Sequence, residues 1–332
     1  MTDGPLPVVL LLPGQGAQHQ GMATGLYRDN AEFAELMDSV FDAFGPLGSQ
    51  IRADWLADRP DTPIWHVTRS TPLLFAIDYA LSVFVQRRGV RPVALLGHSA
   101  GELAAAVLAD IFTLTDAAGV LVTRVLRMSD TPPGGLLAVA AGAAQIREIL
   151  GWRGLVGSDG VAVAAINAPG QTVLAGLDAP LAEVSRRLST AGLTVRPVPA
   201  GTAFHSPALA DLAVTDRELF VDVPTRPPRI PVCSGYLGGP LTVDAIRDPA
   251  FWASHPAAPV LFWPALRSIL DVRDVLFLEC GPGQELSTLA RRHPAIRRGD
   301  SKAVALLPPK DRPGTGDLRS VLTALEAAGI GR

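Results

Sequence analysis

The sequence is poor in the features that mark secreted, membrane-bound and nucleic-acid-binding proteins. Cys233 and Cys280 are the only cysteines in 332 residues, too few for a disulfide framework, so a reducing compartment is expected. No apolar run approaches the roughly 20 residues of a membrane-spanning helix. The net charge of −3 gives no basic excess for nucleic acid, and the histidines and cysteines lack the spacing of a metal site. We therefore expect a cytoplasmic protein without nucleic-acid, membrane or metal partners.

The chain does contain enough apolar sequence for a large core. Hydrophobic residues make up 48% of it and charged residues 18%. Short apolar runs alternate with segments of helical periodicity, which is the pattern of an α/β fold. Strands are predicted at residues 7–12, 93–96, 229–235 and 275–283, helices at residues 30–44, 71–87, 102–109, 116–128 and 317–329, and a surface loop at residues 308–316.

One stretch has a different rhythm from the rest of the chain. Residues 134–199 alternate in the order strand, helix, strand, strand, helix, strand. This βαββαβ order is the split-βαβ pattern of a ferredoxin-like unit. We interpret it as a small subdomain inserted into a larger α/β body of residues 1–133 and 200–332.

The best candidate for chemistry is Ser99. It lies in GHSAG between a predicted strand and a predicted helix, which is the setting of a nucleophile elbow. Such a turn exposes the serine hydroxyl and directs the N–H of the next residue, Ala100, toward a developing oxyanion. The motif alone is weak, and an ordinary serine at a helix N-terminus is the alternative interpretation.

A serine nucleophile needs a base, and His205 in GTAFHSP is the best candidate. It follows the predicted insert, where the chain returns to the body. A structural core or surface histidine is the alternative. His98 adjoins Ser99, but neighbouring residues of an elbow point in different directions, so we expect His98 to orient the site.

For two further residues, sequence spacing alone allows either a functional or a structural interpretation. Arg124 follows Ser99 in LVTRVLRM, and it could bind a carboxylate through two N–H groups or be a solvated helix arginine. Gln15 in GQGAQ lies between glycines that let its backbone N–H approach a ligand. It could equally belong to an ordinary tight turn.

Seven sequence blocks, taken together and in order, resemble the malonyl-CoA:acyl-carrier-protein transacylase family, which includes the acyltransferases of polyketide synthases. The resemblance covers nearly the whole chain and implies an α/β-hydrolase-like body with a ferredoxin-like insert. The blocks are LPGQGAQ, GHSAGELAAA, the arginine Arg124 at the family spacing, INAPGQTVLAG, AFHSP, FWASHPAAPVLF and ECGPGQELSTLARR.

The resemblance implies a role for each matching residue. Ser99 is the acyl-bearing nucleophile and His205 its base. The backbone N–H groups of Gln15 and Ala100 form the oxyanion hole. The backbone carbonyl of His255 orients the catalytic imidazole, as a carboxylate does in a serine triad.

The resemblance also implies a substrate pocket. Arg124 binds the free carboxylate of malonyl-type acyl groups, and the bulk of Phe204 disfavours α-branched ones. Thr202 replaces a histidine that polyketide malonyl transferases typically carry, and Thr71 replaces the usual glutamine, so the pocket edge departs from the family pattern. The other residues implied beside the substrate are Asn167 and His98.

The implied activity is transfer of an acyl group, malonyl foremost, from CoA or a carrier protein through a Ser99 ester to the phosphopantetheine thiol of an acidic acyl carrier protein. We expect no bound cofactor and a monomeric, discrete enzyme acting in trans, in fatty-acid supply or polyketide and antibiotic biosynthesis. Alternatives are a transferase that shuttles a bulkier acyl or aminoacyl group between two carriers, a serine esterase or thioesterase, and a non-catalytic scaffold. Basic residues that could steer the carrier are Arg291, Arg292, Arg297, Arg298 and Lys302, and the pair Arg186 and Arg187.

Overall fold

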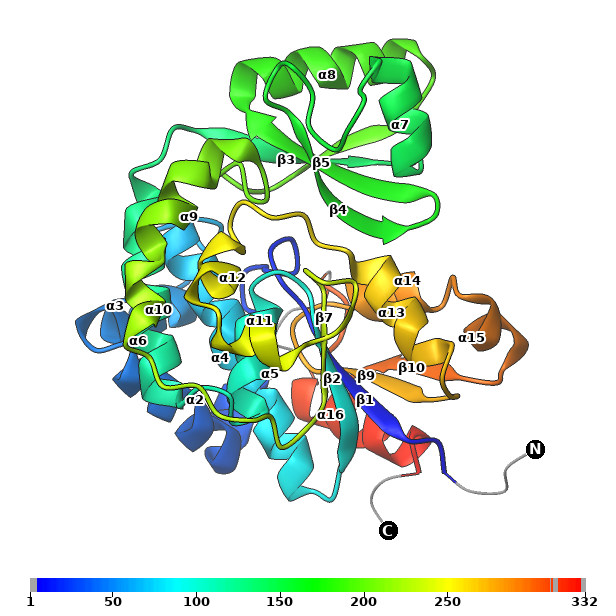
Figure 1. Cartoon of the computed structure of the whole chain (residues 1–332). Helices are drawn as coiled ribbons and strands as arrows, with labels where there is room; N and C mark the ends of the chain where they lie inside the picture. The colour runs from blue at the N-terminus through cyan, green and yellow to red at the C-terminus, as the bar shows by residue number, and fades with distance from the viewer. Residues whose placement is uncertain (1–4, 311, 313–315, 330–332) are drawn as a thin grey trace.

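The computed structural model describes residues 5–310, 312 and 316–329, and it contains two separate β-sheets. Figure 1 shows the smaller sheet and its two helices above a larger body. Part of the loop predicted at residues 308–316 lies outside the described residues. Within the described ranges, no helix is long and apolar enough to cross a membrane.

The larger sheet has the strand order β10-β9-β1-β2-β7-β8 and forms the centre of the body. All neighbouring strands pair in parallel except β8, which runs antiparallel to β7. The central strand is completely apolar and buried, as expected for a parallel strand covered on both faces. The strands are β1 (Val8–Leu12), β2 (Pro92–Gly97), β7 (Val232–Ser234), β8 (Gly239–Pro240), β9 (Leu276–Glu279) and β10 (Lys302–Ala305).

Helices surround this sheet, as Figure 1 shows. Before the small sheet they are α1 (Thr24–Asp29), α2 (Ala31–Ala43), α3 (Pro46–Leu56), α4 (Val67–Arg87), α5 (Gly101–Leu108) and α6 (Leu114–Ser129). After it come a 3-10 turn (Pro207–Leu209) and then α9 (Ala210–Asp216), α10 (Glu218–Val221), α11 (Val243–Arg247), α12 (Pro249–Ser254), α13 (Phe262–Leu270), α14 (Glu285–Ala290), α15 (Pro294–Arg298) and α16 (Asp317–Ala327).

Helix α4 begins four residues earlier than the sequence predicts. His66 caps its N-terminus by accepting the N–H of Thr68, so Pro72 falls in the second turn rather than the first. Proline has no N–H to donate to the carbonyl four residues before it, which is that of Thr68. The side chain of Arg69 supplies the missing donor, with Nη1 3.3 Å from that oxygen. The helix therefore tolerates an internal proline.

The small sheet has the order β4-β5-β3-β6 with antiparallel pairing, which is the ferredoxin-like arrangement. Alternate residues of β3 face opposite ways: Leu137 and Val139 pack beneath the two helices, whereas Leu136 joins the core of the body. We propose residues 134–199 as the small subdomain and residues 1–133 and 200–332 as the body. The elements of the small subdomain are β3 (Gly134–Val139), α7 (Ala143–Leu150), β4 (Ala162–Ala168), β5 (Gln171–Leu177), α8 (Asp178–Thr190) and β6 (Val195–Val198).

Candidate active site

Ser99 lies in a sharp turn between β2 and α5. Its φ of 55° is in the left-handed region, which a residue with a side chain adopts only when the surrounding structure enforces it. A side chain at Gly14 would clash with the carbonyl of His98, and one at Gly101 with the carbonyl of Leu12. These two glycines let the loop after β1 pass directly against the elbow, so backbone from both segments borders the Ser99 hydroxyl.

The base predicted for Ser99 is within hydrogen-bond distance of it. Nε2 of His205 lies 2.7 Å from the Ser99 Oγ. Its Nδ1 faces two backbone carbonyls, that of His255 at 3.0 Å and that of Ala258 at 2.9 Å. Because both carbonyls only accept hydrogen bonds, Nδ1 carries the proton and Nε2 is left to accept one from Ser99. Burial, and secondarily the neighbouring His98, lowers the pKa of His205 to about 4.

The carbonyl of His255 is available because of the sequence that follows it. His255 is the helical residue at the C-terminus of α12. If the helix continued, its carbonyl would accept the N–H of residue 259, but that residue is Pro259 and has none. The oxygen is thus free for the imidazole of His205. The second acceptor, Ala258, was not predicted from the sequence.

Gln15 and Ala100, whose backbone N–H groups are predicted to form an oxyanion hole, lie close to Ser99. Gln15 and Ala100 both line an inner pocket together with Ser99. In the described part of the chain, neither N–H donates to another protein group. The Gln15 side chain is held by Ser70, with its Nε2 3.0 Å from the serine Oγ, and Gly16 donates to Gln18 Oε1 at 2.7 Å. The loop that carries the first N–H is therefore fixed.

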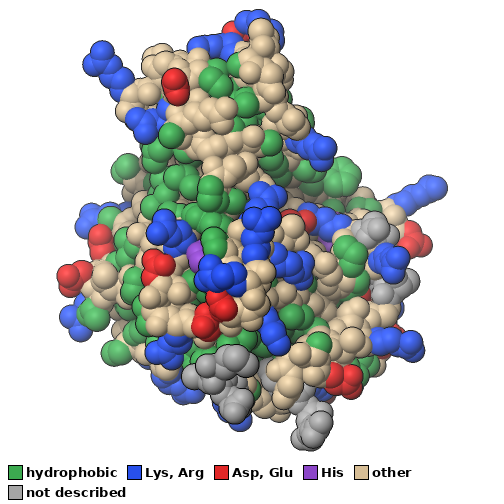
Figure 2. Space-filling model, turned by 90° about the vertical axis from the view of Figure 1, so that its right-hand side faces the viewer, with side chains coloured by type: hydrophobic (Ala, Val, Ile, Leu, Met, Phe, Trp, Pro, Cys, Tyr) green, Lys and Arg blue, Asp and Glu red, His purple; other side chains and the backbone are tan. Residues whose placement is uncertain are grey.

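Ser99 stands where two cavities meet. An outer cleft of 490 Å³ separates the small sheet from the body, and an inner pocket of 50 Å³ lies beyond the serine. Gln15, Ser99 and His205 line both. Figure 2 shows Lys and Arg side chains gathered where the small subdomain meets the body, beneath a hydrophobic patch. Of the predicted basic residues only Arg292 lines the outer cleft, where it is joined by Lys310.

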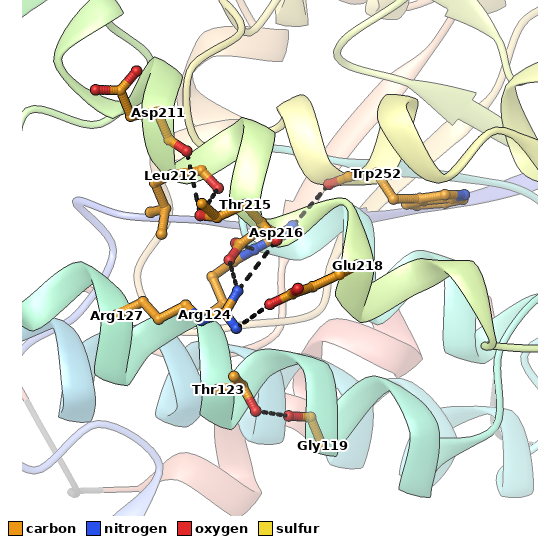
Figure 3. A network of polar contacts seen from close by, with 10 residues as sticks. All are labelled: Gly119, Thr123, Arg124, Arg127, Asp211, Leu212, Thr215, Asp216, Glu218 and Trp252. Carbon is orange, nitrogen blue, oxygen red and sulfur yellow. Dashed lines mark hydrogen bonds and ion pairs between the residues drawn. The ribbon is translucent and has the colours of Figure 1, made fainter.

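Arg124 lies in the inner pocket, 7% exposed, and forms an ion pair with Asp216. Its Nε donates to Asp216 at 2.8 Å and its Nη2 to the carbonyl of Trp252 at 2.9 Å (Figure 3). The ring of Phe220 packs against the guanidinium, with 5.1 Å from its centre to the Arg124 Cζ. The family resemblance predicts Arg124 beside the substrate, whereas nothing in the sequence indicates Asp216.

Comparison with known proteins shows the family to which the chain belongs. The model of the acyl transferase domain matches residues 9–331. The chain belongs to this acyltransferase family. It is 36% identical over 288 residues to a phenolphthiocerol/phthiocerol polyketide synthase protein of Mycobacterium tuberculosis, a match that covers 86% of this chain and 19% of the relative. The acyltransferase thus spans about a fifth of that relative's length.

Solved structures confirm the predicted fold class. The acyltransferase domain from the second module of the salinomycin polyketide synthase has a TM-score of 0.86 at 31% identity, over 99% of this chain and 74% of that one. The loading acyltransferase of the avermectin modular polyketide synthase has a TM-score of 0.85 at 30% identity, over 96% of this chain and 99% of that one. The acyl-carrier-protein S-malonyltransferase of Burkholderia pseudomallei has a TM-score of 0.78 at 25% identity, over 97% and 100%.

The other predicted site residues of the acyltransferase are divided between the cavities. Phe204 and Thr71 line the inner pocket, and the Thr71 hydroxyl is buried without a protein partner in the described structure. Thr202 is buried but is not among the described residues that line either cavity. His98 and Asn167 line the outer cleft, where the His98 Nε2 lies 2.9 Å from the Asn167 Oδ1. That bond joins the elbow to the small sheet.

Two residues of the site carry no clear signal in the sequence. Tyr236 stacks on His255 at 3.7 Å between ring centres and lines the inner pocket. Glu102, in the first turn of α5, accepts hydrogen bonds from the Ser234 hydroxyl and, at 2.8 Å, from the Gly235 N–H. Burial raises the pKa of Glu102 to about 8. It ties the elbow to the end of β7, where Tyr236 follows. Among the described residues, no cluster of His, Cys, Asp and Glu side chains is arranged to hold a metal ion.

Proposed function

We propose that the acyltransferase moves a malonyl group from CoA or a carrier protein, through an ester on Ser99, to the phosphopantetheine thiol of an acyl carrier protein. The observation that carries this proposal is the line of contacts from the Ser99 hydroxyl through His205 to two carbonyls, opening onto a small pocket that contains Arg124. Mixing the protein with a panel of acyl-CoAs and acyl carriers tests it. Intact-mass measurement should show malonyl as the fastest adduct.

In the first half-reaction, Ser99 Oγ attacks the thioester carbonyl while its proton moves to Nε2 of His205. The carbonyl oxygen becomes an oxyanion that the N–H groups of Gln15 and Ala100 bind. One such donor contributes about 10²–10³ in rate, and a positioned base about 10²–10⁴. The C–S bond then breaks, and His205 returns the proton to the departing thiolate.

The second half-reaction runs the same steps in reverse with a different thiol. His205 removes the proton from the carrier's phosphopantetheine thiol, and the sulfur attacks the Ser99 ester. The same N–H groups bind the second oxyanion. The C–O bond breaks, and the Ser99 alkoxide recovers its proton from His205. The carbonyls of His255 and Ala258 keep the imidazole in the required tautomer throughout.

The size of the inner pocket supports malonyl over a bulkier acyl group. A cavity of about 10–15 Å³ is enough for one water molecule, so the inner pocket, at 50 Å³, has room for only a small group. Beyond its ester carbonyl, a malonyl group has four non-hydrogen atoms, a methylene and a carboxylate. A bulkier acyl or aminoacyl group, with clearly more atoms beyond its carbonyl than malonyl has, would have to extend into the outer cleft.

The pH profile of acyl loading should reflect the lowered pKa of His205. Because that pKa is about 4, the imidazole is already neutral above about pH 5, and loading should stay constant from there to pH 8. An unshifted histidine would instead halve the rate near its ordinary value of 6.5. Initial loading rates with acetyl-CoA, whose acyl group does not titrate, measure the profile. A half-maximal rate near pH 6.5 would rule out a base with this environment.

The same shift predicts a pH effect on folding that serves as a control. At His205 the folded state binds fewer protons than the unfolded state between about pH 4 and 6.5, so the contribution of this histidine to stability should fall as the pH drops through that window. Glu102, whose pKa burial raises to about 8, contributes with the opposite sign, so the folded state has to be checked at each pH. Circular dichroism at each pH shows whether the protein is still folded. Only rates from folded samples then count toward the loading profile.

Docking of an acidic carrier should depend on basic residues at the cleft. Arg292 lines the outer cleft, and Arg291 precedes it at the end of α14. Reversing both to glutamate should raise the KM for the carrier about tenfold and flatten its salt dependence, since steering by opposite charge is lost. The rate at which saturating acyl-CoA loads Ser99, measured on the same variant, serves as the reference for the carrier-dependent step.

A matched pair of arginines provides the control for docking. Arg186 and Arg187 lie on α8, on the side of the small subdomain that faces away from the body (Figure 1). Arg186 is already paired with Glu183 at 2.6 Å. Reversal of this pair should leave the carrier KM unchanged. A larger effect here than at Arg291 and Arg292 would move the docking surface to the small subdomain.

A further inference from the structure

A fully buried carboxylate lies behind the inner pocket. Asp216 is the last residue of α9 and has no exposed surface. Its Oδ2 accepts the Nε–H of Arg124 at 2.8 Å, and its Oδ1 accepts from Nη1 of Arg127 at 3.1 Å (Figure 3). The two arginines are three residues apart on α6, so one face of that helix presents both to a single carboxylate.

The far end of this network reaches solvent. Arg127 also pairs with Glu218 at 2.6 Å, and the Glu218 side chain is 69% exposed. Two arginines and two carboxylates thus balance in charge. Glu218 matches the charge of Arg127, which leaves Asp216 as the counter-ion of Arg124. A buried arginine without such a partner would be strongly destabilising.

A second contact holds the guanidinium from another side. The carbonyl of Trp252, in α12, would normally accept the N–H of residue 256, but Pro256 has none. Arg124 Nη2 donates to this free oxygen at 2.9 Å. With Nε on Asp216 and Nη2 on Trp252, Nη1 is the nitrogen that has no protein partner among the described residues. It is the nitrogen available to an acyl group in the pocket that Arg124 lines.

We propose that Asp216 is a positioning residue, which fixes the Arg124 guanidinium so that the inner pocket selects acyl groups bearing a carboxylate. The inference rests on the proposed malonyl transfer. Asp216 touches no substrate and acts only through Arg124. It keeps the charge of Arg124 compensated while the pocket is empty, and it fixes the direction in which the remaining N–H groups point. A guanidinium has several N–H edges, so it can hold Asp216 and an acyl carboxylate together.

The test compares loading of malonyl-CoA and acetyl-CoA. Asp216→Ala should lower kcat/KM for malonyl by about 10–100-fold, because a displaced guanidinium loses its alignment with the carboxylate. Acetyl loading should change less than about threefold. In the Arg124→Ala background, Asp216→Ala should have no further effect on malonyl, because the residue through which it acts is gone. Glu218→Ala, at the exposed end of the network, is the matched control and should leave the malonyl-to-acetyl ratio unchanged.

A milder variant covers the case in which Asp216→Ala does not fold. Asp216→Asn keeps the size and one acceptor, and should lower malonyl loading by a smaller factor in the same selective way. Equal losses for both donors, or full additivity with Arg124→Ala, would overturn the positioning role. If wild-type protein loads malonyl and acetyl at nearly equal rates, the proposed malonyl transfer is overturned, and the role of Asp216 with it. If the malonyl-to-acetyl loading ratio is high in the wild type and unchanged in both Asp216 variants, only the role of Asp216 is overturned.

Discussion

Ser99→Ala is expected to abolish the covalent acyl adduct completely, because no other hydroxyl lies in the elbow facing His205. Ser99→Cys should keep an adduct, now as a thioester. His205→Ala leaves the nucleophile in place and should slow loading by at least about 10²-fold through loss of the general base. Intact-mass measurement with peptide mapping follows each variant. An adduct that persists in Ser99→Ala would place the nucleophile elsewhere.

Arg124→Ala is expected to cut malonyl loading by about 10²–10³-fold, corresponding to roughly 3–4 kcal/mol. A malonyl carboxylate leaves water when it enters the inner pocket, and without its charged partner the cost of burial is several kcal/mol. Acetyl loading should change little, because an acetyl group carries no charge. Initial loading rates for both donors on both proteins make the comparison.

The surroundings of Arg124 make this variant informative. When Arg124 is removed, Asp216 still pairs with Arg127, which it then shares with the exposed Glu218. Arg124→Lys retains the charge but loses the planar guanidinium, so its malonyl loading rate should lie between those of the wild type and Arg124→Ala. If the native acyl group is uncharged, Arg124→Ala should change its transfer by only about tenfold, the lower end of the range for a hydrogen bond between a charged group and a neutral one. Equal losses for malonyl and acetyl would remove the carboxylate-binding role.

Most of the elements that are long or fully buried could be predicted from the sequence, although α3, with 11 residues, was not. The strand expected at residues 7–12 is β1, whose five apolar residues are covered on both faces. Strand β10 was missed because it is a four-residue edge strand that begins with an exposed lysine. The helices between residues 210 and 270 were missed because they have only four to nine residues each, too few to show a period.

Site residues that stand in short motifs could be predicted from the sequence, whereas contacts between distant residues could not. Ser99 and His205 stand in short motifs, and each motif could be interpreted from the residues around it. The pairing of Arg124 with Asp216 joins residues 92 positions apart, and no local pattern encodes it. Pro256 and Pro259 were a usable signal, because each removes an N–H and so frees the carbonyl four residues earlier. Their spacing marks Trp252 and His255 as acceptors.

The central claim is that Ser99 holds the acyl group and passes it to a carrier thiol. Isolating the malonyl-loaded protein and following it with and without a phosphopantetheinylated carrier tests this most directly. Transfer to the carrier should empty Ser99 much faster than water does, with malonyl appearing on the carrier thiol as it leaves the serine. Release of free malonate at the same rate with and without the carrier would contradict the claim.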